Sequence, residues 1–313
     1  MNRARIDVHH HVVPPQYREL FAAHGMKAGG RSIPDWSAED AARFMDTIGV
    51  ETAIMSVSTP GTEPVEPARR PILARQLNEF CADVVRSDPE RFGFWATLTL
   101  PDVDSAIAEA TYSLDELHAD GVVVLANSEG TYLGDRRFDP LMAELDRRNA
   151  VIFVHPSTLP GDEVPGIGAY LADFLLDTSR TAISMVLNGT LDRYPNLRVI
   201  LSHAGGFIPF AAERIATCVA MERPDISPES VLEGLRKFYF DTALSASRSA
   251  LPALLAFAQP DHIVFGSDYP YAPAEIAARF TRNLDNYEGV EHAAVNRDNA
   301  LKLLPRLSVG AAR

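Results

Sequence analysis

Histidines near the start of the chain have the spacing of a metal site. His9 and His11 end the short apolar run that begins at Arg5, and a single residue separates them. Residues two apart on a β-strand point to the same face, so these two imidazoles can converge on one point while His10 faces away. Two imidazoles aimed at one point suit a divalent metal ion. The pair alone is weak support, and its weight depends on how other strands end.

Three later apolar runs end in residues of the same kind. One ends at His155, another ends at His203, and Asp268 closely follows a third. A single histidine at such a position is most often a buried polar group that pairs with the backbone. Four histidines and one aspartate at the same ends of several strands are hard to explain in that way. We therefore interpret them as one site.

The donor types predict one bound metal ion. Nitrogen and carboxylate ligands suit Zn²⁺, which we expect first, and also Mn²⁺ or Fe²⁺. The lysines of the chain are Lys27, Lys237 and Lys302. None of them ends the strand predicted at 121–126, so a modified lysine that bridges two metals is not available there. A mononuclear site is favoured.

Eight apolar segments with helical patterns between them are the elements that must position these residues. The segments are rich in Val, Ile, Phe and Leu, as strands buried on both faces are. The predicted strands span residues 6–9, 52–57, 92–100, 121–126, 151–155, 197–203, 238–242 and 262–266. This order favours an α/β fold, a closed (β/α)₈ TIM barrel with the metal site at the mouth formed by the C-terminal strand ends. A doubly wound sheet is the alternative.

Amphipathic helices are predicted between the strands. One begins after Ser37, with Asp40 three residues later as a rough capping box. Others are predicted over residues 102–118 and 138–149.

Two long segments and the tail are predicted to lack regular structure. Residues 12–35 and 156–180 exceed ordinary loops in length and contain several Pro and Gly residues, so we expect them to cover or wall the site. No break in composition divides the chain. We predict one domain over residues 1–313, with a flexible tail at about 305–313.

Charge and composition disfavour several classes of function. The formal net charge of −13, from 42 acidic and 29 basic residues, argues against nucleic acid or an anionic membrane as the main partner. Cys81 and Cys218 form no C-x-x-C pair, so a disulfide framework is not expected and the cytoplasm is the simplest location. Neither a signal peptide nor a membrane-spanning run is apparent. Serine-hydrolase and nucleotide-binding motifs do not occur either.

The motifs around these residues resemble the amidohydrolase superfamily, and more narrowly its branch of metal-dependent decarboxylases. That branch includes aminocarboxymuconate-semialdehyde, γ-resorcylate and 6-methylsalicylate decarboxylases. The resemblance runs from about residue 4 to residue 304. It rests on Ile6–His11, Phe153–Pro156, Leu201–Gly206, Gly266–Pro270 and Asp298–Leu301. The stretch Tyr132–Asp135, followed by Phe138–Pro140, leans towards the 6-methylsalicylate type.

The resemblance implies a role for each site residue. Metal ligands would be His9, His11, His155 and Asp268. His203 would be the acid/base histidine beside the metal, and Asp268 could also shuttle a proton.

Two arginines are implied to bind substrate carboxylates. Arg214, eleven residues after His203, would reach into a neighbouring subunit's site, which implies a homodimer or a higher oligomer. Arg31 is only an approximate counterpart of the other arginine, because the loop length differs. Both could instead be solvated surface arginines.

For Asp241 and for four aromatic residues, the sequence leaves two interpretations open. Asp241 ends the strand predicted at 238–242 and either orients His203 or bonds the local backbone. The aromatic residues either wall an aromatic pocket or pack in the core. They are Phe207, Phe210, Tyr170 and Phe174.

These expectations predict a metal-dependent, non-oxidative decarboxylase of a small aromatic or muconate-type carboxylic acid, such as a salicylate derivative. The nearest alternative keeps the site and hydrolyses an amide, a lactone or a C–C bond of a ring-cleavage product. Hydratases also occur among such relatives. A non-enzymatic metal-binding barrel is a third possibility, weakened because all five catalytic positions are filled.

Overall fold

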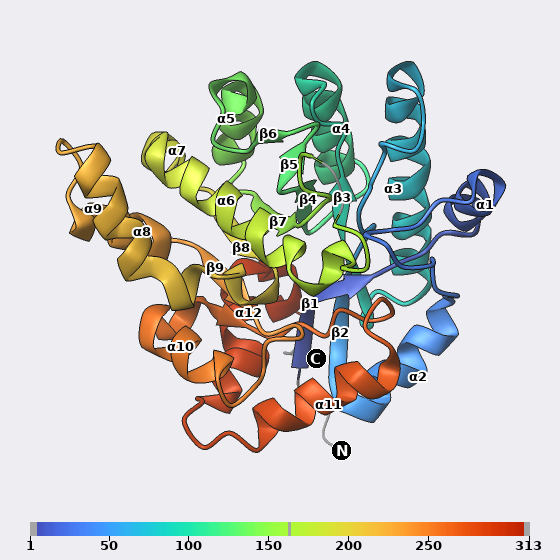
Figure 1. The fold of residues 1–313 in the computed structure, drawn as a ribbon. Coiled ribbons are helices and arrows are strands. Elements are labelled where there is room, and N and C mark those ends of the chain that lie inside the picture. Colours follow the sequence, from blue (N-terminus) through green and yellow to red (C-terminus); the bar gives the residue numbers. More distant parts are fainter. Residues whose placement is uncertain (1–4, 162–163, 310–313) are drawn as a thin grey trace.

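Eight parallel strands form a single sheet that curves into a nearly closed barrel (Figure 1). The computed structural model describes residues 5–161 and 164–309. The strands follow one another around the barrel in chain order: β1 (Arg5–His11), β2 (Val50–Ser56), β3 (Phe92–Thr97), β4 (Gly121–Leu125), β7 (Val151–His155), β8 (Arg198–Leu201), β9 (Tyr239–Asp241) and β10 (Ile263–Val264). All eight predicted strands and the TIM barrel are confirmed. A doubly wound sheet would require a reversal of strand order, which this sheet does not show.

Backbone hydrogen bonds join β1 to the segment around and after β10, and we call this junction the seam. The Val8 N–H donates to the Phe265 carbonyl at 3.0 Å, and the Asp268 N–H donates to the His9 carbonyl at 2.8 Å. The His11 N–H donates to the Tyr269 carbonyl at 2.7 Å. Residues from opposite ends of the sequence therefore lie side by side at the mouth.

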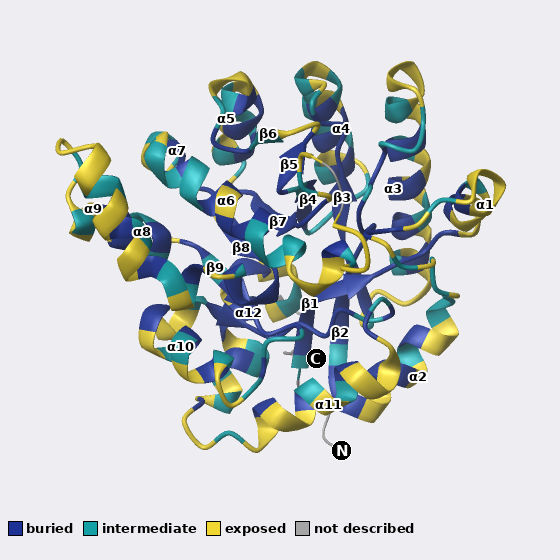
Figure 2. Cartoon of the chain, viewed as in Figure 1, coloured by how far each residue is buried: buried dark blue, intermediate teal, exposed yellow. Residues whose placement is uncertain are grey.

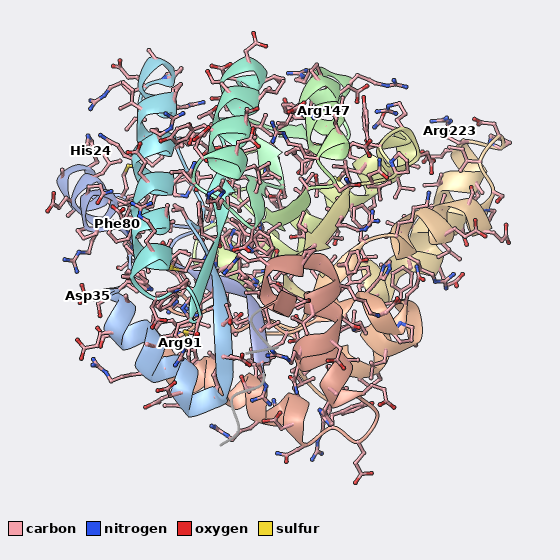
Figure 3. All side chains as sticks on the ribbon, turned by 180° about the vertical axis from the view of Figure 1, so that it is seen from behind. His24, Asp35, Phe80, Arg91, Arg147 and Arg223 are labelled. Carbon is pink, nitrogen blue, oxygen red and sulfur yellow. The ribbon has the colours of Figure 1, made fainter. Side chains whose placement is uncertain are left out.

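Helices surround the sheet, and charged side chains at their ends, such as Arg147 and Arg223, project outward (Figures 1 and 3). The α-helices are α1 (Pro15–His24), α2 (Ala38–Ile48), α3 (Arg70–Ser87), α4 (Val103–Asp115), α5 (Asp139–Arg147), α6 (Asp173–Leu187), α7 (Thr190–Arg193), α8 (Ile208–Glu222), α9 (Pro228–Arg236), α10 (Ala250–Phe257), α11 (Ala274–Asp285), α12 (Asn299–Leu303) and α13 (Pro305–Val309). A small hairpin of β5 (Asn127–Ser128) and β6 (Thr131–Tyr132) follows β4.

Local sequence signals explain where two of the predicted helices begin. The Ser37 hydroxyl accepts from the Asp40 N–H at 3.0 Å and caps α2. The Asp102 carboxylate accepts from the Ser105 N–H at 3.2 Å and caps α4. Each cap satisfies a backbone donor that lacks a partner within its helix.

The strands of the barrel are mostly buried (Figure 2), and buried aromatic rings support its mouth. Trp95 and Phe153 stack with ring centroids 6.3 Å apart, and the Trp95 indole N–H donates to the Val8 carbonyl at 2.9 Å. Both rings are completely buried. The Phe153 ring lies 4.9 Å from that of His9, so tight packing holds the first histidine from below.

Two segments predicted as long loops contain helices. Residues 12–35 include α1, which has Pro15 at its first position and buries Tyr17 and Phe21. Residues 156–180 include the 3₁₀ helix η3 (Ala169–Leu171) and the first turns of α6. Proline is compatible with the first turn of a helix, so its presence did not exclude one.

The end of the chain also differs from the expectation of a flexible tail. Residues 305–309 form α13, and Arg306 pairs with Asp120 at 2.9 Å. The rest of the predicted tail, residues 310–313, lies outside the described residues. Within the described ranges, no helix is both long and apolar enough to cross a membrane.

Candidate metal centre

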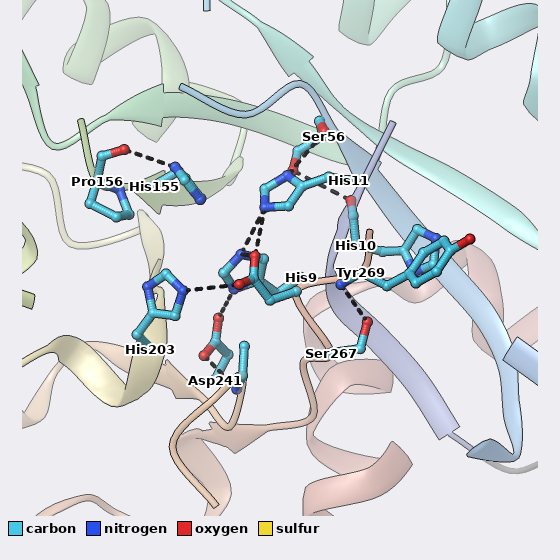
Figure 4. A network of polar contacts seen from close by, with 12 residues as sticks. His9, His10, His11, Ser56, His155, Pro156, His203, Asp241, Ser267 and Tyr269 are labelled. Atoms are coloured by element: carbon cyan, nitrogen blue, oxygen red, sulfur yellow. Dashed lines mark hydrogen bonds and ion pairs between the residues drawn. The ribbon is translucent and has the colours of Figure 1, made fainter. Parts of the chain in front are cut away.

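Four buried side chains converge at the mouth of the barrel (Figure 4). His9, His11, His155 and Asp268 each present one donor atom, and these atoms all lie within 4.8 Å of one another. The Nε2 atoms of His9 and His11 are 3.1 Å apart. Asp268 Oδ1 lies 3.2 Å from the former and 3.1 Å from the latter. The structure thus brings together all four residues that the sequence predicted as ligands.

The hydrogen bonds of the three histidines use Nδ1, so Nε2 is the atom that each ring offers to a cation. Each ring contacts an oxygen acceptor through Nδ1, which must therefore carry the hydrogen. The acceptors are Asp241 Oδ2 for His9 at 2.6 Å, the Ser56 carbonyl for His11 at 3.2 Å and the Pro156 carbonyl for His155 at 2.8 Å. Three imidazole lone pairs and one carboxylate oxygen form a donor set that fits a single divalent ion such as Zn²⁺ or Mn²⁺.

The electrostatics of the cluster favour positive charge at its centre. Burial alone would lower the pKa of His9, but attraction to Asp241 and Asp268 and their hydrogen bonds raise it to about 10. Burial lowers the pKa of His11 and of His155, and charge on His9 lowers both further. Burial would raise the pKa of Asp268, yet hydrogen bonds from His11, His203 and His9 bring it well below its usual range. His11, His155 and Asp268 are thus held in the neutral and ionised forms that a metal ion requires, whereas His9 must lose a proton when the ion binds.

His10 faces away from the cluster, as the strand alternation predicted. Its Nδ1 lies 3.1 Å from Asp7 Oδ2, and its ring lies beside that of Tyr269. Asp7 also accepts from the N–H and the hydroxyl of Ser267, at 3.0 and 2.6 Å. Sequence reasoning missed this role of Asp7. An acidic residue inside a buried strand was the available signal, since such a charge needs partners.

His203 lies beside the four-residue cluster. Its Nε2 is 3.7 Å from Asp268 Oδ2, and its buried Nδ1 has no hydrogen-bond partner among the described residues. The backbone has φ of 52° at His203 and 63° at Asp268, an uncommon conformation for residues other than glycine. Such strain is concentrated at functional sites, where the surrounding structure enforces it.

A cavity of about 210 Å³ opens onto the cluster. His155, His203 and Asp268 line its floor, and Arg31 lines it from the segment after α1. The Arg31 guanidinium lies 5.1 Å from the centroid of the Tyr170 ring. Arg31 is therefore placed where a substrate carboxylate could reach it.

Asp241 has a different partner from the predicted one. It contacts His9 rather than His203, and its other oxygen accepts from the Ala243 N–H at 3.0 Å. The expectation that it orients His203 is wrong, because the end of β9 directs its carboxylate towards β1. The predicted bond to local backbone is present.

Arg214 lies outside the cavity of its own chain. It is exposed on α8, and no described residue pairs with it.

The four aromatic residues of the sequence prediction line the cavity or the groove beside it. Tyr170 and Phe174 line the cavity, and all four line an adjoining apolar groove of about 390 Å³: Tyr170, Phe174, Phe207 and Phe210. Phe210 is 87% exposed. Core packing is therefore the wrong interpretation for it.

Comparison with known proteins gives consistent results. The family model described as Amidohydrolase matches residues 6–306. A 6-methylsalicylic acid decarboxylase of Aspergillus aculeatus is 41% identical, over 97% of this chain and 96% of the relative.

Solved structures share the fold. The crystal structure of an amidohydrolase II protein has a TM-score of 0.89 and 29% identity, covering 96% of this chain and 99% of the other. A dihydroxybenzoic acid decarboxylase from Polaromonas sp. JS666, with bound manganese and the inhibitor 2-nitroresorcinol, has a TM-score of 0.81. It is 23% identical and covers 97% of each chain, so this likeness concerns the fold alone.

Proposed function

The chain belongs to the amidohydrolase family, and we propose that it is a metal-dependent, non-oxidative decarboxylase of a small hydroxylated aromatic acid, of the 6-methylsalicylate kind. One observation carries the proposal: a buried three-histidine, one-aspartate cluster opens into a small cavity with Arg31 at its wall. The relative that acts on 6-methylsalicylic acid matches nearly the whole chain and supports this substrate class.

His9, His11, His155 and Asp268 would hold the ion. When bound, a divalent cation polarises a carboxylate or phenolate oxygen and fixes the substrate's orientation. Zinc remains the ion that the donor set predicts first. The manganese-bound structure with the same fold supports Mn²⁺ as well.

The cavity walls provide binding and orientation for a single aromatic ring. Arg31 can pair with an anionic group of the substrate through its planar guanidinium. Phe174, Tyr170 and Leu244 offer apolar surface to the ring faces. They also limit water around the reacting carbon.

His203 and Asp268 are the groups placed to deliver the proton that the reaction needs. The bond between the ring carbon and the carboxylate breaks, CO₂ departs, and the electron pair stays on the ring carbon until a proton arrives. His203 Nε2 lies 3.7 Å from Asp268 Oδ2 next to the cavity, so a proton would pass between these groups through one water.

The test combines metal analysis with a CO₂-release screen over hydroxybenzoates and muconates. We expect about one divalent ion per chain and conversion of 6-methylsalicylate to 3-methylphenol and CO₂, both abolished by chelation and restored by added metal. No CO₂ from any of these acids, together with water-dependent cleavage of a lactone or an ester, would instead select the hydrolase.

We also propose that the protein forms a homodimer through the apolar groove. Phe207, Phe210, Tyr170 and Leu171 are exposed around it, and apolar patches of this kind mark interaction surfaces. Arg214 lies one helical turn after Phe210 on α8, so both point to the same side. A second copy covering Phe210 would meet Arg214 too. Location in the cytoplasm stays a prediction.

A further inference from the structure

A single peptide group connects His155 to a buried carboxylate that no site motif includes. The Pro156 carbonyl accepts from His155 Nδ1 at 2.8 Å. The N–H of the same peptide group, that of Ser157, donates to Asp177 Oδ2 at 2.8 Å. Asp177 lies on α6 and is completely buried. One peptide plane is thus held at both ends, by the imidazole and by the carboxylate.

Asn127 holds the Asp177 carboxylate from the other side. Asp177 Oδ1 accepts from Asn127 Nδ2 at 2.8 Å, and the same amide nitrogen donates to the Thr158 carbonyl at 3.1 Å. Asn127 Oδ1 accepts from the Gly130 N–H at 3.0 Å, which fixes the orientation of the amide. The hairpin after β4, the loop after β7 and α6 therefore meet at this carboxylate.

We propose that Asp177 is a positioning residue for the metal centre, acting on His155 through the Pro156–Ser157 peptide. The inference rests on the proposed metal site. A carboxylate that accepts from the peptide N–H polarises that peptide, which strengthens its carbonyl as an acceptor for His155. His155 Nε2 becomes a better electron-pair donor, and its ring is fixed in orientation. Asp241 acts on His9 in the same way, but by direct contact.

The same loop continues to the wall of the cavity. The Ser157 hydroxyl lies 3.0 Å from that of Thr59, and Thr59 lines the cavity beside the cluster. A displacement of Ser157 would therefore shift both His155 and the cavity wall at Thr59.

The chain contains a matched control for a buried carboxylate held by an asparagine. Glu109 on α4 is 4% exposed and accepts from Asn78 Nδ2 at 2.8 Å. Asn78 in turn accepts from the N–H of Thr97, at the end of β3, at 2.7 Å. None of the hydrogen bonds described for this network reaches a histidine.

The experiment is a titration of metal-free protein with Co²⁺, whose visible absorption reports both affinity and ligand geometry. Wild type, Asp177→Asn and Glu109→Gln are compared, together with their midpoints of thermal unfolding. We expect the Kd of Asp177→Asn for Co²⁺ to rise about 10- to 100-fold, with an altered spectrum. Glu109→Gln should lose thermal stability yet keep the wild-type Kd and spectrum.

Equal Kd and spectrum for Asp177→Asn and wild type would overturn the inference alone. A wild-type protein that binds no Co²⁺ would overturn the proposed metal site and the inference with it. If Asp177→Asn does not fold, the same titration is carried out on Asn127→Ala. This variant removes the amide that holds Asp177 and leaves the contact of Asp177 with Ser157. A Kd raised at least about threefold supports the inference, and a wild-type Kd overturns it.

Discussion

The ion-pair contact of His203 with the cluster is to Asp268, and its ring lies 4.9 Å from that of His9. Replacing His203 should separate catalysis from metal binding. We expect His203→Asn to retain its metal while kcat for CO₂ release falls about 10²- to 10⁴-fold, since general acid–base groups contribute rate factors of this size. Metal content by mass spectrometry and kcat on the best substrate of the screen test this.

His262→Asn is the control for the loss of one imidazole. His262 contacts the Phe238 carbonyl and stacks on Tyr239, away from the cluster. The kcat of the His262→Asn variant should match that of the wild type. If His203→Asn purified without metal, His203 would have to be counted among the ligands.

The proton on His9 should make metal affinity depend on pH. Because its pKa is raised from 6.5 to about 10, metal-free His9 carries a proton at pH 7 that an incoming ion must displace. Affinity should therefore rise with pH, by up to about tenfold per unit, and level off near pH 10. Competition with a chelator between pH 6.5 and 8.5 measures the slope.

Asp241→Asn removes the main source of the raised pKa of His9. The variant should bind metal more weakly, and its affinity should change less with pH over the same range, because His9 is then already largely neutral. A flat dependence in the wild type would contradict this account of the charge on His9.

At the scale of elements, the turn between β8 and α8 depends on a glycine. Gly206 has φ of 64°, and a Cβ there would overlap the Leu175 carbonyl of α6. The next N–H, of Phe207, donates to the Ser179 hydroxyl at 2.8 Å, so α6 holds this turn. Gly206→Ala should lower the free energy of unfolding by more than about 2 kcal/mol and reduce kcat by displacing His203.

Gly189→Ala is the control for the effect of a positive φ. Gly189 has nearly the same φ, 65°, with ψ of 29° against −120° at Gly206, and a Cβ there would meet only Arg193 at an ordinary contact distance. Its cost in urea unfolding should be about 1 kcal/mol, with kcat unchanged. Equal losses in both variants would show that the positive φ which the two glycines share determines the cost, and that the overlap with Leu175 of α6 adds nothing to it.

Some elements could be predicted from the sequence because their signals are local. Period-two alternation in β1 was sufficient to separate His9 and His11 from His10, and the apolar runs before His155 and His203 marked strand ends. The hydrogen-bond partners of the site residues could not be predicted from such local signals. Asp241 meets His9 because β9 and β1 flank β10 where the barrel closes, which depends on the whole fold.

Helix α1 was missed for a different physical reason. Its stability comes from burying Tyr17 and Phe21 against the rest of the molecule rather than from its own weak apolar pattern. The contact of Asp177 with the loop after β7 could not be predicted from the sequence either, since it joins residues 20 positions apart through a backbone N–H.

At the scale of the whole molecule, the apolar groove should determine the oligomeric state. We expect the wild type to be a dimer by light scattering and Phe210→Glu to be a monomer, because burying an unpaired charge in the interface is costly. Met221→Glu is the control: Met221 is 76% exposed on the same helix but does not line the groove. A monomeric wild type at micromolar concentration would contradict the proposed dimer.

The seam has a consequence for how the protein matures in the cell. Two donor atoms of the cluster lie in the first dozen residues of the chain and another at Asp268, so synthesis delivers them at widely separated times. A nascent chain with seven strands outside the ribosome has no complete set of donors to retain an ion. A chain that stops before the last barrel strand lacks the Asp268 donor, so we expect it to bind metal more weakly than the whole chain.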